Sequence, residues 1–164
     1  MRTRLALGVA ASLMLTACTG PNTVGDTLGS IRYVVDKTTA DVGLATTLHT
    51  GASIAALADR VQTLGDQQLA QRLRAVDSTG TVVVSLYFDA CSKSGPSLQL
   101  AGAELTVRYA EELNRTCVRA IDTLTVFAIA KDRLPNPVTL AVCPTQGRVT
   151  LNGDTVTGQP ARMC

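Results

Sequence analysis

Side chains that could act as nucleophiles or bases are few in this 164-residue chain. His49 is the only histidine, so a Ser-His or Cys-His catalytic pair would have to use it. Its position near the end of a helical pattern instead favours a surface residue or a cation at a helix C-terminus. Ser92 and Ser94 flank Lys93, which suggests a serine-lysine hydrolase, but adjacency in sequence does not make a dyad and the G-x-S-x-G elbow is absent from the sequence. We therefore expect no catalytic residue and no enzymatic activity.

Other reaction classes have no better sequence support. Glu111 and Glu112 are adjacent, so their side chains point apart and do not form the facing carboxylate pair of a glycosidase. Neither a Walker loop nor a G-x-G-x-x-G motif occurs, so we expect no nucleotide cofactor. With three tyrosines, two phenylalanines and no tryptophan, the chain has few rings on which a sugar or a base could stack.

The N-terminus has the pattern of an export signal. Arg2 and Arg4 precede an uncharged run over residues 5–17, which is shorter than the roughly 20 residues that span a bilayer. The motif Leu15-Thr16-Ala17-Cys18 resembles the lipobox of bacterial lipoproteins. This resemblance implies that the Cys18 thiol receives a diacylglyceryl group and that cleavage leaves Cys18 first. Two acyl chains hold a protein firmly at a membrane. An ordinary secreted protein is the alternative.

The other cysteines suggest disulfides. Their separations of 26, 26 and 21 residues do not match the close pairs of a zinc site, so no metal site is expected. An even number in an exported chain predicts two bridges. We favour the pairing that closes the shorter loops, with the other pairings left open: Cys91 with Cys117, and Cys143 with Cys164.

Charge and composition restrict the partners. The chain has 15 basic and 13 acidic residues, and two of the basic ones, Arg2 and Arg4, lie in the signal. The remainder is balanced, so neither nucleic acid nor a polybasic membrane contact is indicated. The composition is similar to that of lipoproteins from high-GC, actinobacterial-type bacteria. We expect lipid anchoring through Cys18 to the outer, extracytoplasmic face of the bacterial cell membrane, with the outer membrane as the alternative.

Three segments are expected: a signal peptide at 1–17, the lipidated cysteine with a flexible tether at 18–30, and one globular domain at 31–164. Within that domain, apolar spacing predicts helices in its first part, 31–77. The first runs from Ile31 to Leu48, the second follows Ser53 and ends at Gly65, and a short third is capped by Asp66. These apolar stripes are more typical of core-facing helices than of partner-docking ones.

From residue 80 onward, alternation of apolar and polar residues predicts strands, with a loop at 92–96 and a loop or single helical turn at 111–119. The strand at 121–130 is the most apolar and should be central. Asn152-Gly153 predicts the turn of a hairpin over 148–157. The remaining strands are predicted at 82–88, 98–100, 105–109 and 138–142.

The predicted fold is α+β: two or three N-terminal helices followed by an antiparallel sheet, or a small sandwich, of five to seven short strands. The predicted function is that of a non-enzymatic binding or structural module of the cell envelope, with another envelope protein as a candidate partner. Two alternatives stay open. One is a carrier of lipid or of a small apolar ligand in an internal cavity, and the other is an envelope hydrolase using Ser92 or Ser94.

Overall fold

The computed structural model describes residues 22–34, 44–112, 121–142 and 147–161. This part of the chain contains ten strands, two α-helices and one 3-10 helix. In chain order they are β1 (Asn22–Val24), β2 (Asp26–Val34), β3 (Thr47–His49), α1 (Ala52–Thr63), α2 (Gln67–Arg74), β4 (Thr81–Asp89), β5 (Lys93–Ala101), β6 (Glu104–Glu112), β7 (Ile121–Ala130), η1 (Lys131–Arg133), β8 (Val138–Ala141), β9 (Arg148–Asn152) and β10 (Thr155–Gly158).

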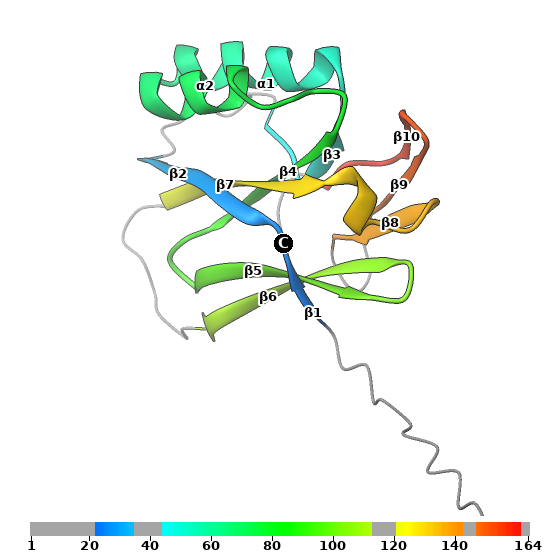
Figure 1. The fold of residues 1–164 in the computed structure, drawn as a ribbon. Coiled ribbons are helices and arrows are strands. Elements are labelled where there is room, and N and C mark those ends of the chain that lie inside the picture. Colours follow the sequence, from blue (N-terminus) through cyan, green and yellow to red (C-terminus); the bar gives the residue numbers. More distant parts are fainter. Residues whose placement is uncertain (1–21, 35–43, 113–120, 143–146, 162–164) are drawn as a thin grey trace, which may run out of the picture.

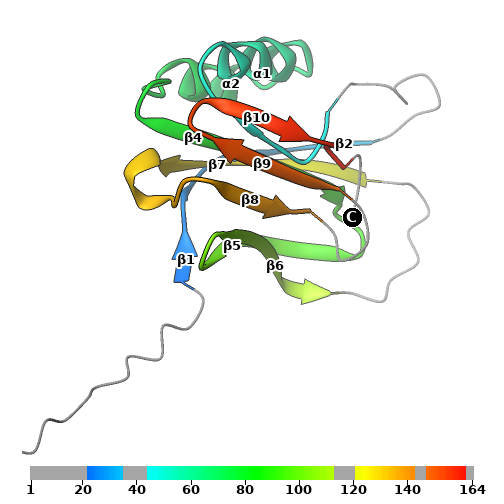
Figure 2. The same ribbon diagram turned by 90° about the vertical axis from the view of Figure 1, so that its right-hand side faces the viewer.

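The strands form two facing sheets, and the helices cover the outer face of the smaller one (Figure 1). The four-stranded sheet has the order β2-β7-β4-β3, and the six-stranded sheet has the order β1-β5-β6-β8-β9-β10. Neighbouring strands are antiparallel except β6 and β8, which are parallel. Viewed from the side, β8, β9 and β10 extend the larger sheet below the helices (Figure 2). The α+β class and the sandwich are confirmed, whereas five to seven strands was too low an estimate.

The smaller sheet is buried on both faces because it lies between the helices and the larger sheet. On β4, Val82 and Val84 pack into the core between the sheets, while Val83 packs beneath the helices. On β7, Phe127 faces the core between the sheets and Val126 faces the helices. A nearly continuous apolar sequence is what a strand covered on both sides requires. The central position predicted for 121–130 is confirmed, because β7 lies between β2 and β4.

The first predicted helix, from Ile31 to Leu48, is wrong. Ile31 lies in β2 and Leu48 lies in β3. Both segments form edge strands of the smaller sheet, with β2 paired to β7 and β3 paired to β4. The prediction relied on apolar residues at helical spacing, but the backbone hydrogen bonds of these two segments are made with β7 and β4, which are distant in the sequence. The helices therefore lie between strands rather than ahead of the sheet.

Residues 22–30, predicted as part of a flexible tether, form strands. β1 pairs with β5 in the larger sheet, and β2 pairs with β7 in the smaller one. The chain crosses between the sheets at Gly25, which has φ of 85°. A Cβ at this glycine would lie 2.9 Å from Cγ1 of Ile129, so the crossing passes close to the core. The turn-forming residues that suggested a tether therefore belong to a strand crossover.

The two remaining helices are present as predicted, except that α1 begins at Ala52 and therefore includes Ser53 instead of following it. The buried residues of α1 are Ile54, Leu57, Ala58 and Val61, and Gly65 follows the helix with φ of 96°. At the start of α2, Asp66 accepts a hydrogen bond of 2.9 Å from the backbone N–H of Leu69.

The strand boundaries needed more correction. The predicted loop at 92–96 is mostly part of β5, and Glu111 and Glu112 end β6. The hairpin is present, but its register pairs Thr155 with Asn152, so Gly153 and Asp154 form the turn, one residue later than predicted. Strand pairing lengthened elements that local composition marked as loops.

Candidate functional site

A cleft of about 290 Å³ opens between the two sheets, beside the edge strand β2 and the start of β5. We call it the inter-sheet cleft. It lies where the apolar core between the sheets gives way to polar side chains. Its lining residues are Thr27, Ser30, Arg32, Phe88, Ala90, Lys93, Ser94, Gly95, Pro96, Thr123 and Thr125.

One wall of the inter-sheet cleft carries hydroxyl groups from β2 and β7. Ser30 Oγ and Thr125 Oγ1 share a hydrogen bond of 2.8 Å. Thr123 is 3% exposed, and its Oγ1 is buried with no hydrogen-bond partner. Side chains alternate along β7, so Thr123 and Thr125 share the face on which Phe127 packs into the core. Threonine in place of valine is therefore what makes this end of the sandwich polar.

Aromatic and basic side chains stand on the side of β4, β5 and β6. The rings of Phe88 and Tyr109 are tilted by 59°, with centroids 5.3 Å apart. Nζ of Lys93 lies 4.9 Å from the centroid of the Tyr109 ring, within the range of a cation–π contact. Lys93 is partly buried, so this contact holds a positive charge beside the cleft.

Two basic side chains line the inter-sheet cleft. Arg32 on β2 and Lys93 on β5 both line it, and none of the lining residues that the structure describes is acidic. At the exposed rim of the cleft, Ser94 Oγ donates to Glu111 Oε2 over 3.4 Å. Hydroxyl donors and two cations are suited to a small ligand that carries hydrogen-bond acceptors.

The contacts of Ser92 and Ser94 do not favour the alternative of a serine hydrolase. Ser94 donates to Glu111, and Ser92 donates to Asp89 at its Oδ2 over 3.2 Å. Both serine hydroxyls therefore donate their hydrogen bonds to carboxylates. The sequence had singled out Lys93 and Ser94 for another chemistry, and it missed their partners Arg32, Thr123 and Thr125.

A second pocket, of about 310 Å³, lies under α1 at the edge strand β3 and contains His49 and Ser85. Nε2 of His49 lies 2.9 Å from Oγ of Ser85, and Ser85 Oγ donates to the carbonyl oxygen of Ala45 over 2.7 Å. Burial lowers the pKa of His49 to about 4, while a backbone hydrogen bond with Ser53 acts in the opposite direction. His49 is therefore neutral at pH 7.

This His-Ser contact has the distance of a catalytic pair but not its other features. Ser85 is 1% exposed and its hydroxyl proton is directed to Ala45, so Nε2 of His49 is the donor rather than the base. None of the described residues lining this pocket is a carboxylate that could orient the imidazole. The arrangement satisfies buried polar groups. The prediction that His49 ends a helix at the surface is wrong, because it lies partly buried in β3.

A third buried polar contact lies on the helix-facing side of the same sheet. The hydroxyl of Tyr87 donates to Oδ2 of Asp122, which is 3% exposed. Thr46 joins this network, because its Oγ1 donates to the carbonyl oxygen of Tyr87 over 3.2 Å. The sequence showed Asp122 only as an acidic residue at the start of an apolar strand. Its pairing could be recognised only from the strand register.

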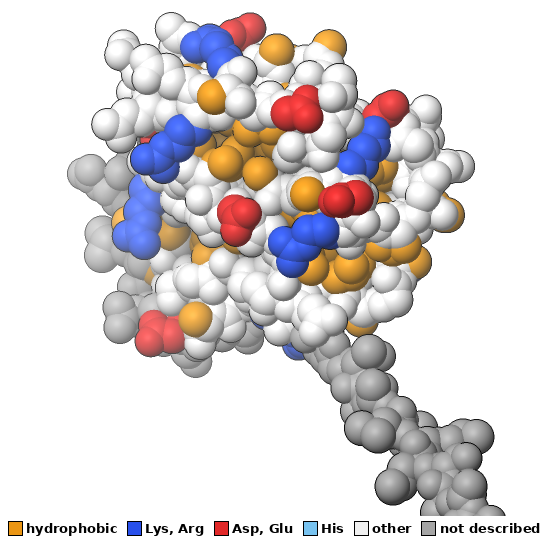
Figure 3. Space-filling view, in the orientation of Figure 1, with side chains coloured by type: hydrophobic (Ala, Val, Ile, Leu, Met, Phe, Trp, Pro, Cys, Tyr) orange, Lys and Arg blue, Asp and Glu red, His pale blue; other side chains and the backbone are white. Residues whose placement is uncertain are grey.

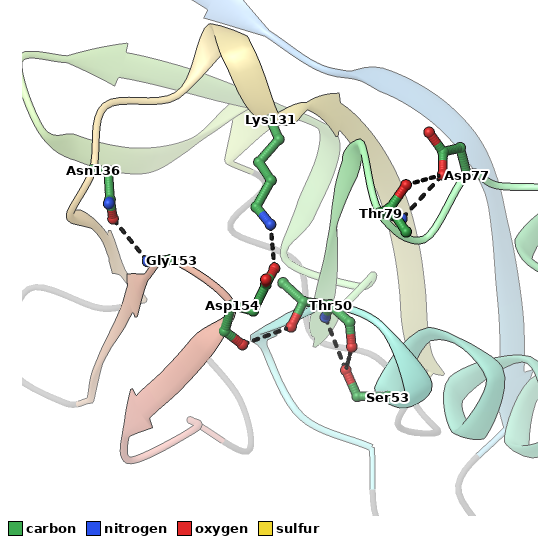
Figure 4. Close-up of polar contacts among 8 residues, drawn as sticks. All are labelled: Thr50, Ser53, Asp77, Thr79, Lys131, Asn136, Gly153 and Asp154. Carbon is green, nitrogen blue, oxygen red and sulfur yellow. Dashed lines mark hydrogen bonds and ion pairs between the residues drawn. The ribbon is translucent and has the colours of Figure 1, made fainter.

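The tip of the last hairpin is fixed by a further polar cluster (Figure 4). Lys131 pairs with the carboxylate of Asp154, and Thr50 Oγ1 donates to the Asp154 carbonyl oxygen over 3.0 Å. The Gly153 N–H donates to Oδ1 of Asn136 over 2.8 Å. In the neighbouring turn, hydrogen bonds from Thr79 lower the pKa of Asp77. These contacts join turns to one another, so we interpret them as stabilising the fold.

The predicted lipidation and cysteine sites lie mostly outside the described residues. These are Cys18, Cys117, Cys143 and Cys164. Cys91, just after β4, is 8% exposed and disulfide-bonded. Within the described ranges, no group of three or more His, Cys, Asp or Glu side chains could hold a metal ion. Neither α-helix of these ranges is long and apolar enough to cross a membrane.

One face of the surface mixes basic, acidic and apolar side chains without a large patch of either charge (Figure 3). The positive lining of the inter-sheet cleft is therefore local. Comparison with known proteins found no matching protein family, no matching curated protein and no matching solved structure.

Proposed function

We propose that this chain is a lipid-anchored, non-enzymatic binding module of the bacterial cell envelope, and that the inter-sheet cleft takes its ligand. The observation that carries the proposal is the Thr123 hydroxyl, which is buried beside the cleft without a partner. An unsatisfied buried hydroxyl costs about 1–3 kcal/mol, and most such groups in folded proteins are paired. A ligand with an acceptor atom would satisfy this one.

The lipobox at Leu15-Thr16-Ala17-Cys18 supports the anchoring part of the proposal. Only residues 19–21 separate Cys18 from the first strand at Asn22. At about 3.3–3.6 Å per residue, the four steps from Cys18 to Asn22 span at most roughly 14 Å. A chain anchored at Cys18 would hold β1 near the lipid headgroups.

The alternative functions have less support in the described geometry. A carrier of long apolar chains needs a cavity lined by apolar side chains, whereas hydroxyls and cations line much of the cleft. A hydrolase needs an activated nucleophile. Ser92 and Ser94 contact carboxylates, and the hydroxyl proton of Ser85 is directed to a backbone carbonyl.

Native mass spectrometry of the full chain, extracted from membranes in mild detergent, tests the ligand. Ser30 is exposed on β2 and lines the cleft, so Ser30→Leu should obstruct the cleft, while it also removes the hydrogen bond to Thr125 Oγ1. We expect a small-molecule adduct on the wild type that is lost from Ser30→Leu. Thr155→Leu, at an exposed position on β10, is the matched control and should retain it. An adduct equally present on all three proteins, or absent from the wild type, would count against the proposal.

Metabolic labelling tests the anchor separately. Labelled fatty acid should enter the wild type and not Cys18→Ala, and only the wild type should sediment with membranes. Separation of inner and outer membranes would identify the one that receives it. Equal labelling of both proteins would remove the lipidation claim while leaving the cleft to be judged on its own.

A further inference from the structure

We propose that the ligand of the inter-sheet cleft carries a small oxyanion, a carboxylate or a phosphate, held between Arg32 and Lys93. This inference rests on the proposed function and specifies its ligand class. It is carried by the combination of two cations and an unpartnered buried hydroxyl in one cleft.

The two cations come from different sheets. Arg32 is on β2 of the smaller sheet, and Lys93 is on β5 of the larger one. An anion between them would join the sheets at the end of the sandwich where the apolar core stops. Charge-assisted hydrogen bonds are about twice as strong as neutral ones, and an arginine can present two parallel N–H donors to a carboxylate or phosphate.

The hydroxyl wall complements this charge. A hydroxyl can donate to an oxyanion, and Thr123 Oγ1 has no competing partner. The pair formed by Ser30 and Thr125 leaves one hydroxyl hydrogen available, because a single hydrogen makes their shared bond. Burying each of these hydroxyl groups against an anion would cost less free energy than burying it against an apolar surface, because the anion accepts a hydrogen bond.

The size of the cleft limits the rest of the ligand. About 290 Å³ is at the lower end of small-molecule sites, which usually span roughly 300–1,000 Å³. This volume suits an anion with a short polar or apolar substituent, such as a glycerol phosphate. That chemistry has two sources beside a membrane: a free metabolite and an anionic lipid headgroup.

The test uses the full lipidated chain in lipid nanodiscs. In phosphatidylcholine discs, calorimetric titration with glycerol 3-phosphate, acetate and uncharged glycerol measures binding of free anions. We expect binding of glycerol 3-phosphate or acetate and not of glycerol. Arg32→Gln and Lys93→Gln should each weaken it at least tenfold. Arg133→Gln, an exposed arginine of η1 outside the cleft, is the matched control and should bind as the wild type does.

The second arm identifies a lipid source. If a headgroup occupies the cleft, the wild type should melt at a higher temperature in phosphatidylglycerol discs than in phosphatidylcholine discs, and Arg32→Gln should not. Both proteins keep their lipid anchor, so the comparison isolates the cleft. If phosphatidylglycerol stabilises the wild type and Arg133→Gln but not Arg32→Gln, the ligand is a lipid headgroup. If only the soluble anions bind, the ligand is a free metabolite.

The inference is overturned if neither arm gives a signal that depends on Arg32, or if glycerol binds as tightly as glycerol 3-phosphate. An adduct in native mass spectrometry that is lost from Ser30→Leu would then still support a binding module, for an uncharged ligand. Failure of that experiment as well would overturn the proposed function itself.

Discussion

At the scale of single residues, polar groups in this protein lie where a wholly apolar core would have been possible. Ser85 and Asp122 are buried beneath the helices and have partners, whereas Thr123 is buried between the sheets and has none. Paired groups contribute to a unique arrangement of the strands. An unpaired group only costs stability, so its presence beside a cleft points to a ligand.

Replacing Thr123 by valine should separate stability from binding. Valine has nearly the same shape and lacks the unsatisfied hydroxyl, so Thr123→Val should raise the free energy of unfolding, by up to about 1–2 kcal/mol. The same change should weaken binding of the anion. Urea unfolding and titration of one preparation would measure both effects. A Thr123→Val protein that is less stable and binds normally would show that the hydroxyl has a structural role.

The lowered pKa of His49 predicts that the folded protein loses stability on acidification. Its folded-state pKa of about 4 lies below its ordinary value of 6.5, so the unfolded state binds the proton more readily. The stabilising effect of the neutral form is complete above pH 6.5 and is lost as the pH falls from there toward 4. At pH 4.5 the loss should be about 2–3 kcal/mol relative to pH 7.5.

Urea unfolding of the wild type and of His49→Gln at both pH values measures this contribution. Carboxylates also titrate in this range, and the difference between the two proteins removes their effect. The wild type should lose more stability than His49→Gln. Parallel pH profiles for the two proteins would contradict the depressed pKa.

At the scale of elements, local signals succeeded where the element is held by its own residues. The third predicted helix begins where expected because Asp66 caps the backbone N–H of Leu69 within the same turn. The segment from Ile31 to Leu48 failed because its strands are completed by β7 and β4, which follow much later in the chain. Local periodicity is weak evidence when the hydrogen-bond partner is distant.

The cap of α2 offers an element-scale prediction. Asp66→Ala removes the side-chain acceptor for Leu69 N–H and should destabilise the protein by about 1 kcal/mol. Asp66→Asn keeps an acceptor and should retain most of the stability. Chemical denaturation of the three proteins provides the measurement, and equal loss in both variants would show that the charge, rather than the cap, matters.

At the scale of the whole molecule, the first two strands determine how the two sheets are joined. β1 and β2 are consecutive, yet they belong to different sheets, and Thr27, Ser30 and Arg32 of β2 line the inter-sheet cleft. The proposed anchor at Cys18 is therefore close in sequence to β2, which lines the proposed binding site. A ligand that bridges the sheets would stabilise the sandwich.

The cysteines give a prediction at the same scale. We expect non-reducing peptide mapping to recover Cys91 linked to Cys117 and Cys143 linked to Cys164, because these bridges close the shorter loops. Reduction should lower the melting temperature, since each bridge restricts the unfolded chain. A peptide joining Cys91 to Cys143 or Cys164 would refute this pairing.

The sequence by itself determined the features that depend on neighbouring residues. These include the lipobox motif, the two real helices with Gly65 and Asp66 at their boundary, the alternating strands and the α+β class. Only the tertiary structure decided which segments pair and which side chains meet. Arg32, Lys93 and Thr123 lie far apart in the chain and converge because β2, β5 and β7 border one cleft. Convergence of this kind depends on long-range strand register, which local spacing does not specify.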